Sequence, residues 1–218
     1  MLVSGKSRTR SDRRSIVEKH AASPLDRSRL SPFDDNRLSP YASAEQGDEQ
    51  MTFDVLQTLV DYHYWARDRL FPAVEALTDE QLRRPLGNSF ASVFDTVVHL
   101  CGADWIWRSR WEGISPTALP SPDLYDDLAR VRAAWEDEEH RIRAIAARLG
   151  PDGIARPIEY TGWDGRRQAQ PFWQMLQHLV NHGSYHRGQV TTMLRQMNVP
   201  PPKSMDLIAF YRERAALT

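Results

Sequence analysis

Apolar side chains recur at helical spacing through most of the chain after residue 50. From Phe53 onward they fall three or four residues apart, which predicts a helix that buries one face and runs to about Leu77. The positions that form this face are Leu56, Leu59, Val60, Leu70 and Val74. Pro72 lies inside the pattern and predicts a bend. Thr78, with Gln81 three residues later, is a capping box that predicts the start of a short second helix.

Two further helices are indicated by their start and stop residues. Ser92 and Asp95 predict an N-cap for a helix that continues through VVHLCGADWIWRSRW and stops at Gly113. Ser121 stands directly before a proline. Serine is a preferred N-cap and proline is favoured at the first helical position, so this pair predicts the start of another long helix, which ends at Gly150.

The pattern changes after that helix. Residues 154–170 include the stretch PIEYTGWDGRRQAQ, whose composition is β-like and whose Asp164-Gly165 pair predicts a short hairpin. Pro171 then starts a final long helix that reaches about Met197, where three consecutive prolines follow closely and end it. The sequence therefore predicts an all-α chain: a four-helix bundle with a short β-hairpin-like insert before the last helix.

The first fifty residues differ in composition from the rest. They carry nine basic and eight acidic residues and only two aromatic ones, Phe33 and Tyr41, whereas all seven tryptophans come later. So little apolar surface does not offset the entropy lost on folding. We therefore expect a disordered N-terminal extension over residues 1–50 and one bundle domain over residues 51–218. Because Met51 opens the periodic part directly, a start codon assigned too far upstream is a second interpretation of the extension.

Charge and cysteine content exclude several classes of function. The 218 residues carry a formal net charge of −1, which predicts no general attraction to nucleic acid or to an anionic membrane. No apolar run approaches the ~20 residues of a membrane span, and the N-terminal residues lack the apolar core of a secretory signal, so we expect a cytoplasmic protein. A single cysteine, Cys101, allows neither an internal disulfide nor a thiolate-only metal site.

Three of the seven histidines fall in the stretch HLVNHGSYHRGQ, each four residues after the last. At about 100° per residue, His186 lies about 40° from the centre of the buried face, His182 about 80° and His178 about 120°. The first two therefore face inward, and an HxxxH pair on one helical face is a known metal-ligand spacing. The same two side chains are also compatible with hydrogen-bonded core packing.

Two histidines are too few for a metal site, and helical periodicity offers two candidates for a third. His63 falls near the centre of the first helix's apolar face. His99 belongs to a helix that is apolar almost all round, beside small residues that leave room for a ligand. Spacing alone does not choose between them, because a lone histidine on an apolar face is equally a core residue.

Three stretches resemble the DinB/YfiT-like family of four-helix metalloproteins: YHYWARDRLF (62–71), DTVVHLCGADWIWRSRWEG (95–113) and PFWQMLQHLVNHGSYHRGQV (171–190). The resemblance covers nearly all of residues 51–218. It implies a divalent metal ion, such as zinc, nickel or iron, bound by His99, His182 and His186. The family often has asparagine at the position of His63, so this histidine is a departure. It is expected to line the pocket, to hydrogen-bond a water on the metal, or to pack.

The resemblance also implies a class of reaction. Three neutral imidazoles leave at least one position open on the metal, as in catalytic zinc sites, where a bound thiol or water becomes more acidic. Relatives include thiol-dependent S-transferases and isomerases. The leading expectation is therefore a metal-dependent enzyme that activates a low-molecular-weight thiol or water to act on a small molecule. The alternatives are a metal-dependent hydrolase and a non-catalytic, stress-associated metal-binding protein. Relatives commonly form homodimers, and we expect one here.

Several neighbouring residues have two interpretations each. Asp95 and Gln189 are candidates to orient the metal-bound histidines, although Asp95 equally suits a helix cap and Gln189 a solvated face. Arg187 meets either a substrate anion or a carboxylate of the bundle. His178 is expected to be a partly exposed structural histidine, and Cys101 to point away from the metal into the core.

Overall fold

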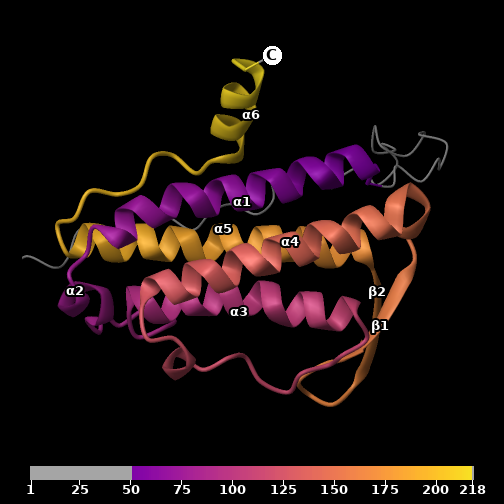
Figure 1. The fold of residues 1–218 in the computed structure, drawn as a ribbon, viewed down its shortest axis with the longest axis horizontal. Coiled ribbons are helices and arrows are strands. Elements are labelled where there is room, and N and C mark those ends of the chain that lie inside the picture. Colours follow the sequence, from indigo (N-terminus) through magenta and orange to yellow (C-terminus); the bar gives the residue numbers. More distant parts are fainter. Residues whose placement is uncertain (1–50, 218) are drawn as a thin grey trace, which may run out of the picture. The chain divides into compact units, whose positions relative to one another are not determined.

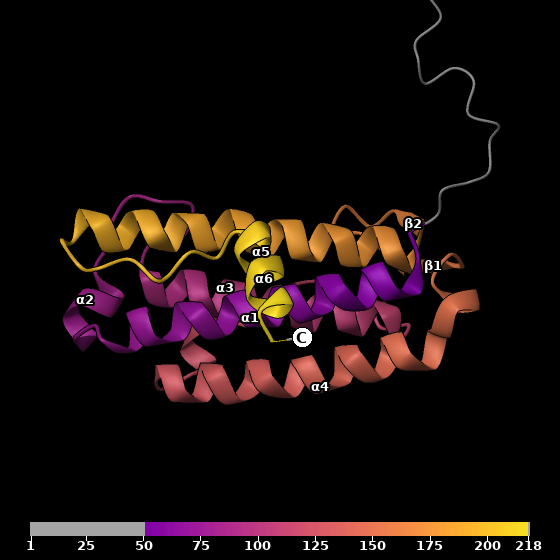
Figure 2. The ribbon, with the colours of Figure 1, turned by 90° about the horizontal axis from the view of Figure 1, so that it is seen from above.

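The computed structural model describes residues 51–217, and the expectations for residues 1–50 lie outside this range. The described part is built on four long helices: α1 (Phe53–Glu75), α3 (Val93–Trp111), α4 (Leu128–Gly153) and α5 (Phe172–Gln196) (Figure 1). Both α1 and α3 pack against α4 and α5, so the four helices enclose one core, as predicted for a four-helix bundle (Figure 2). None of the described helices combines the length and apolar character that crossing a membrane requires.

The core draws its large side chains from all four long helices. The largest fully buried apolar residues are Leu56, Leu70, Phe71, Phe94, Leu100, Trp135, Ile142, Phe172, Leu179, Met193 and Leu194. Among them, Phe71 of α1 and Trp135 of α4 meet edge to face, with ring centroids 6.0 Å apart. The helix α3 is buried on nearly all sides, since 15 of its 19 residues are buried. Its sequence therefore shows no single inner face.

Two predicted helix starts are confirmed by their hydrogen bonds. At the start of α2 (Asp79–Arg83), the Thr78 hydroxyl accepts from the Gln81 amide at 3.2 Å, and the Gln81 side chain accepts from the Thr78 amide at 3.0 Å. At the start of α3, the Ser92 hydroxyl accepts from the Asp95 amide at 3.1 Å. Both caps join residues within one turn, so the sequence contains all that is needed to recognise them.

The predicted start of the next long helix was wrong. Ser121 caps only the 3₁₀ turn η2 (Pro122–Leu124), after which the backbone becomes extended. The long helix α4 begins later, where the Asp127 carboxylate accepts from the Arg130 amide at 2.8 Å. The Asp127 cap competes with the serine–proline pair, and local sequence alone does not decide which one leads a long helix.

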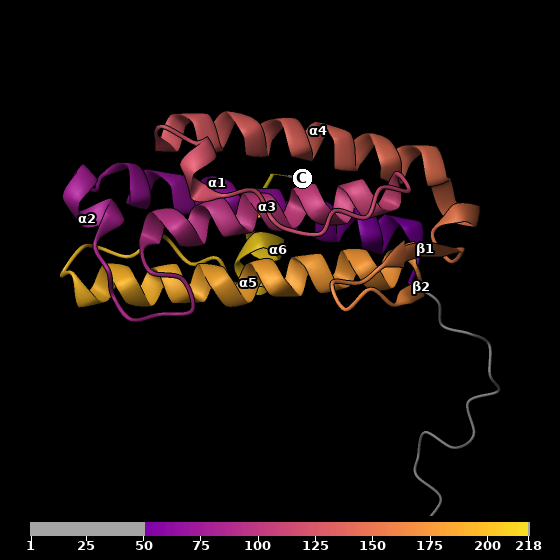
Figure 3. The same cartoon turned by 90° about the horizontal axis from the view of Figure 1, so that it is seen from below.

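The predicted hairpin is present between α4 and α5. Strand β1 (Pro157–Thr161) pairs antiparallel with β2 (Arg167–Pro171), and Gly165 in the connecting loop has the positive φ of 75° that favours glycine. Strand β1 contacts α3, and β2 leads directly into α5, so the hairpin covers one end of the bundle (Figure 3). Tyr160 of β1 thereby meets Trp107 of α3, with ring centroids 5.5 Å apart.

A short helix, α6 (Leu207–Ala215), follows the three prolines and was not predicted. Its Phe210 packs against Tyr62 and Trp65 of α1, with ring centroids 5.9 Å and 5.5 Å away. The Trp65 indole also donates to the Glu213 carboxylate at 3.0 Å. These contacts join distant parts of the sequence, so no local pattern indicates that the segment is ordered on α1.

Gly183 of α5 lies at a close approach to α1, and its replacement tests that packing. A Cβ at this position would lie 2.8 Å from both His63 Cε1 and Arg187 Nη1. We expect Gly183→Ala to lower the free energy of unfolding by about 1–2 kcal/mol, because the overlap outweighs the helix propensity of alanine. The matched control is Gly188→Ala on the same helix, where the new Cβ meets nothing within 4 Å and a gain of about 0.5–1 kcal/mol is expected.

Urea unfolding of the metal-free protein, followed by tryptophan fluorescence, measures both variants. Two variants of equal stability would contradict the close approach of α5 to His63.

Candidate metal centre

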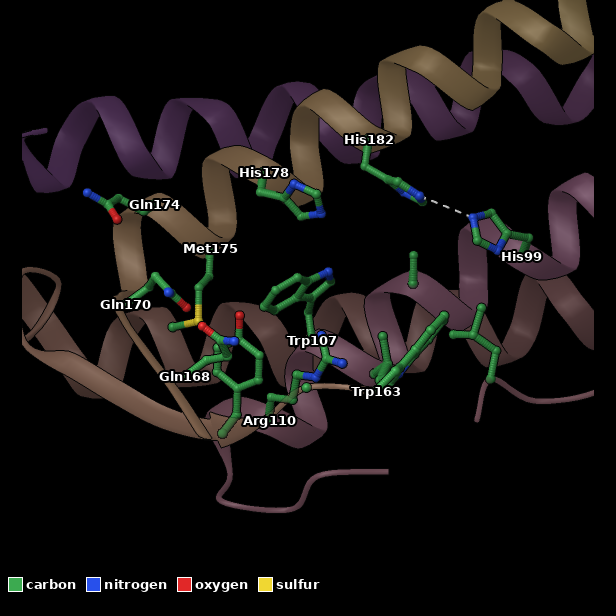
Figure 4. A pocket seen from close by; sticks show the side chains of 15 residues that line it. His99, Trp107, Arg110, Trp163, Gln168, Gln170, Gln174, Met175, His178 and His182 are labelled. Carbon is green, nitrogen blue, oxygen red and sulfur yellow. Dashed lines mark hydrogen bonds between the residues drawn. The ribbon is translucent and has the colours of Figure 1, made fainter. Parts of the chain in front are cut away.

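The structure brings His99 of α3 together with His182 and His186 of α5. The Nε2 atom of His182 lies 3.1 Å from Nε2 of His99 and 3.1 Å from Nε2 of His186. One ligand atom from each of the three lies within 4.8 Å of the others. Figure 4 shows the rings of His99 and His182 directed at each other from their two helices. Residues 83 positions apart in the sequence thus converge on one point.

Hydrogen bonding within the triad does not account for this convergence. An imidazole nitrogen carries either one proton or one lone pair, so Nε2 of His182 makes a full hydrogen bond with only one of its two neighbours. Two nitrogens that share an ion at ~2.0–2.1 Å lie at most about 4.2 Å apart, and both observed separations are within that limit. With one ligand atom of each histidine within 4.8 Å of the others, the three residues form a candidate site for a divalent metal ion.

Gln189 determines which nitrogen of His186 is free. Its side-chain NH₂ donates to the Ser89 hydroxyl at 2.8 Å, which leaves its oxygen to accept from Nδ1–H of His186 at 2.8 Å. With the proton on Nδ1, the lone pair of His186 is on Nε2, the atom that faces the other histidines. Of the two residues expected to orient the triad, Gln189 does so. Asp95 belongs to the cap of α3, where it accepts from the Ser92 hydroxyl at 2.8 Å.

Burial keeps the three imidazoles neutral. It lowers the pKa of His99 to about 3, and the neighbouring His182 and His186 lower it further because they would repel a second charge. The pKa of His182 falls to about 4, again chiefly through burial and then through His186. Burial also lowers the pKa of His186. Neutral imidazole is the form that binds a metal, so the triad is ready to bind at pH 7 without losing protons.

A cavity of about 540 Å³ opens beside the triad, lined in part by His99 and His182. His178 also lines it, but its nitrogens do not join the cluster of possible ligand atoms. Its ring instead packs edge to face on Trp107, with centroids 5.2 Å apart. Exposure along α5 follows the predicted order, because His178 is exposed, His182 half-buried and His186 buried.

Of the three roles considered for His63, the geometry favours packing, because His63 does not line this cavity. The residue is 2 % exposed, and its Nε2 lies 3.1 Å from the carboxylate of Asp104 on α3. The same carboxylate accepts from the Tyr64 hydroxyl at 3.1 Å and from the Trp135 indole at 2.8 Å. His63 is thus one of three donors to a buried acid that joins α1, α3 and α4.

The structure also resolves the roles of Arg187 and Cys101. The guanidinium of Arg187 is buried and donates to the Ser184 hydroxyl at 3.1 Å. No carboxylate of residues 51–217 lies at ion-pair distance from it, and it does not line the cavity beside the triad. Cys101 is a free, buried thiol, as expected, and burial raises its pKa to about 12. A thiol with that pKa is not a nucleophile at neutral pH.

Sequence reasoning missed two residues that shape the site. The Phe90 ring stacks on His99 with centroids 4.0 Å apart, and it also approaches His186 at 5.4 Å. Arg110 lines the cavity from α3. Phe90 lies in the irregular segment before α3, where no periodicity indicates its direction. Arg110 stands in an almost fully buried helix, and a charge in such a helix is the signal that could have identified it.

Comparison with known proteins agrees with this architecture. The model of the DinB family matches residues 49–213. Protein DinB of Bacillus subtilis (strain 168) is 26 % identical over 145 residues, which is 63 % of this chain and 83 % of that protein. The crystal structure of a DinB-like protein from Bacillus cereus ATCC 10987 covers 70 % of this chain and 97 % of its own, with a TM-score of 0.50. At 18 % identity, that likeness concerns the fold.

The hydrogen bond from His186 to Gln189 gives a test of the donor set. Gln189→Leu removes the acceptor for Nδ1–H, and we expect zinc affinity to fall by about 10- to 100-fold. Gln189→Glu is the matched control, because it keeps an acceptor of the same reach and is expected to retain the affinity. Competition with a chromophoric chelator measures both. Equal affinity of the leucine variant and the unmodified protein would show that Gln189 does not orient His186.

Proposed function

The chain belongs to the DinB family, and from that premise we propose that it is a divalent-metal-dependent enzyme of the thiol S-transferase type. His99, His182 and His186 hold the ion, and zinc, nickel and iron all accept imidazole ligands. The observation that carries the proposal is that the three nitrogens converge beside a cavity of about 540 Å³. Structural zinc sites are closed by four protein ligands, whereas catalytic sites keep a position for water or substrate.

The side chains around the triad support binding and activation of a small molecule. A divalent ion bound there would lower the pKa of a thiol or of water, so that the anion would form near neutral pH. His99 and His182 line the cavity, so their side of the triad faces the space available to a substrate. Phe90, stacked on His99, covers that ring with apolar surface. Excluding water in this way strengthens electrostatic interactions in the site.

The nucleophile in this proposal comes from outside the chain. The sulfur of a low-molecular-weight thiol forms a bond to an electrophilic carbon, the leaving group departs with the bonding electrons, and the thiol proton passes to solvent. Cys101 does not serve as the nucleophile, because it is buried and its pKa is raised to about 12. Among the residues that line the cavity there is no cysteine, serine or threonine. An external thiol or water therefore supplies the attacking atom.

Metal retention tests the ligand assignment. We expect the full chain, purified without a histidine tag or added metal, to carry about one equivalent of a divalent metal, as coordination by three protein ligands predicts. His99→Ala, His182→Ala and His186→Ala each remove a ligand and should lose it. His178→Ala is the matched control from the same helix and should retain it. Elemental analysis measures the metal content of each variant. If His178→Ala lost its metal as completely as His186→Ala, the ligand assignment would be contradicted.

Turnover tests the reaction class. With 1-chloro-2,4-dinitrobenzene as electrophile and cysteine or glutathione as thiol, we expect conjugation that requires both metal and thiol. Because the ion supplies several kcal/mol of stabilisation, His99→Ala should lower the rate on the order of a hundredfold or more. Ester hydrolysis without any need for thiol would instead favour a hydrolase. Retained metal with no turnover of either substrate class would indicate a binding protein.

A further inference from the structure

Within residues 51–217, Arg110 is a buried cation without a counter-charge. Its side chain is on α3 and the residue is 7 % exposed. The guanidinium carbon lies 4.7 Å from the ring centroid of Trp107 and 4.8 Å from that of Tyr160, so aromatic rings contact its faces. Its Nε is buried without a hydrogen-bond partner among the described residues, and no carboxylate of that part of the chain lies within ion-pair distance of it.

Arg108, two residues earlier on α3, is a buried arginine whose charge is compensated. It donates twice to Glu138, at 2.8 Å and 3.0 Å, and once to Glu112 at 2.7 Å. Burial lowers the pKa of Arg110, and only Tyr160 partly opposes that effect. An arginine remains charged at any pH a protein experiences, so the uncompensated charge persists.

The cavity around Arg110 has the features of a binding site for a flat molecule. Its aromatic walls include Trp107, Tyr160 and Trp163, of which Trp163 is 62 % exposed in the hairpin loop. Three amides, Gln168, Gln170 and Gln174, complete the polar lining, and the oxygen of Gln170 is buried without a partner in the described structure. Figure 4 shows Trp107, Arg110 and Trp163 below His178 and His182 of α5, and Trp107 packs edge to face on His178. A volume of about 540 Å³ suits a small organic ligand.

We propose that Arg110 is the specificity-determining residue of this cavity and binds the carboxylate of an organic substrate whose flat apolar body lies against the aromatic walls. The proposal deepens the proposed function, on which it rests for identifying the ligand as the substrate. Arginine presents a planar fork of donors that matches a carboxylate. The lining contains no other arginine or lysine and no acid, so one positive charge faces one negative charge. In the metal-free protein, a phosphate monoester, with a charge of about −1.5 to −2, would remain under-compensated.

The probes for the test are 2-naphthoate and its neutral analogue 2-naphthamide. Isothermal calorimetry of the full chain measures their binding, with the protein zinc-loaded and then metal-free. We expect naphthoate to bind more tightly in both states. Arg110→Gln should weaken naphthoate binding by about 10- to 100-fold, the loss of a charged hydrogen bond, and leave naphthamide binding unchanged.

Two variants serve as controls. Arg195→Gln removes the same charge from an exposed position in the last turn of α5, and it should bind naphthoate like the unmodified protein. Equal weakening in Arg195→Gln and Arg110→Gln would mean that net charge alone is responsible and would overturn the proposal. Arg110→Lys keeps the charge but loses the fork, and intermediate affinity is expected. Circular dichroism establishes that each variant is folded. The preference of the unmodified protein for naphthoate over naphthamide is a separate test that does not depend on any variant.

The metal-free titration separates this proposal from the proposed function. If naphthoate is preferred only when zinc is bound, and Arg110→Gln keeps that preference, the carboxylate binds at the histidines and Arg110 has no such role. If the metal-free protein prefers naphthoate but no metal-dependent turnover is found, the anion site stands and the enzyme assignment fails. Tighter binding of 2-naphthyl phosphate than of naphthoate to the metal-free protein would overturn the carboxylate class.

Discussion

The buried carboxylate of Asp104 is the constraint on which the interior of the bundle depends. It is 0 % exposed and accepts from His63 and Tyr64 of α1 and from Trp135 of α4. A buried acid without donors costs several kcal/mol, so α3 has only one favourable register against its two neighbours. Asp104 follows His99 by little more than one turn on the same helix. The hydrogen bonds to Asp104 therefore fix how far along the bundle His99 lies.

The approach of α5 to the same network brings in the other two histidines. Gly183 has no side chain, and that absence leaves room for the ring of His63 from α1 and for the guanidinium of Arg187 from α5 itself. His182 precedes this glycine, and His186 lies one turn after it. The contact between Gly183 and His63 thus positions α5 on α1 and, with it, orients the HxxxH pair toward α3. His63 supports the triad through this packing and not as a ligand atom within it.

The extent to which the sequence predicts the structure follows from the range of the interactions involved. The caps at Thr78 and Ser92 were predicted because donor and acceptor lie within one turn. The short helix α6 was missed because Phe210 owes its burial to Tyr62 and Trp65, which are far away in the sequence. The choice between His63 and His99 could not be made from periodicity, since α3 is buried on nearly all sides. The resemblance to a family supplied that choice, and the partner of His63 is visible only in three dimensions.

Burial explains both why the histidines are neutral and why Arg110 is suited to bind an anion. Histidine responds to burial by releasing its proton, so His99 and His182 have lowered pKa values and free lone pairs. Arginine does not release its proton, so Arg110 keeps its charge, which no carboxylate of the described residues pairs. The cavity therefore contains lone pairs at one end and an unpaired cation at the other. A divalent ion at the histidines adds positive charge to the same space, which favours a substrate pair with a thiolate at one end and a carboxylate at the other.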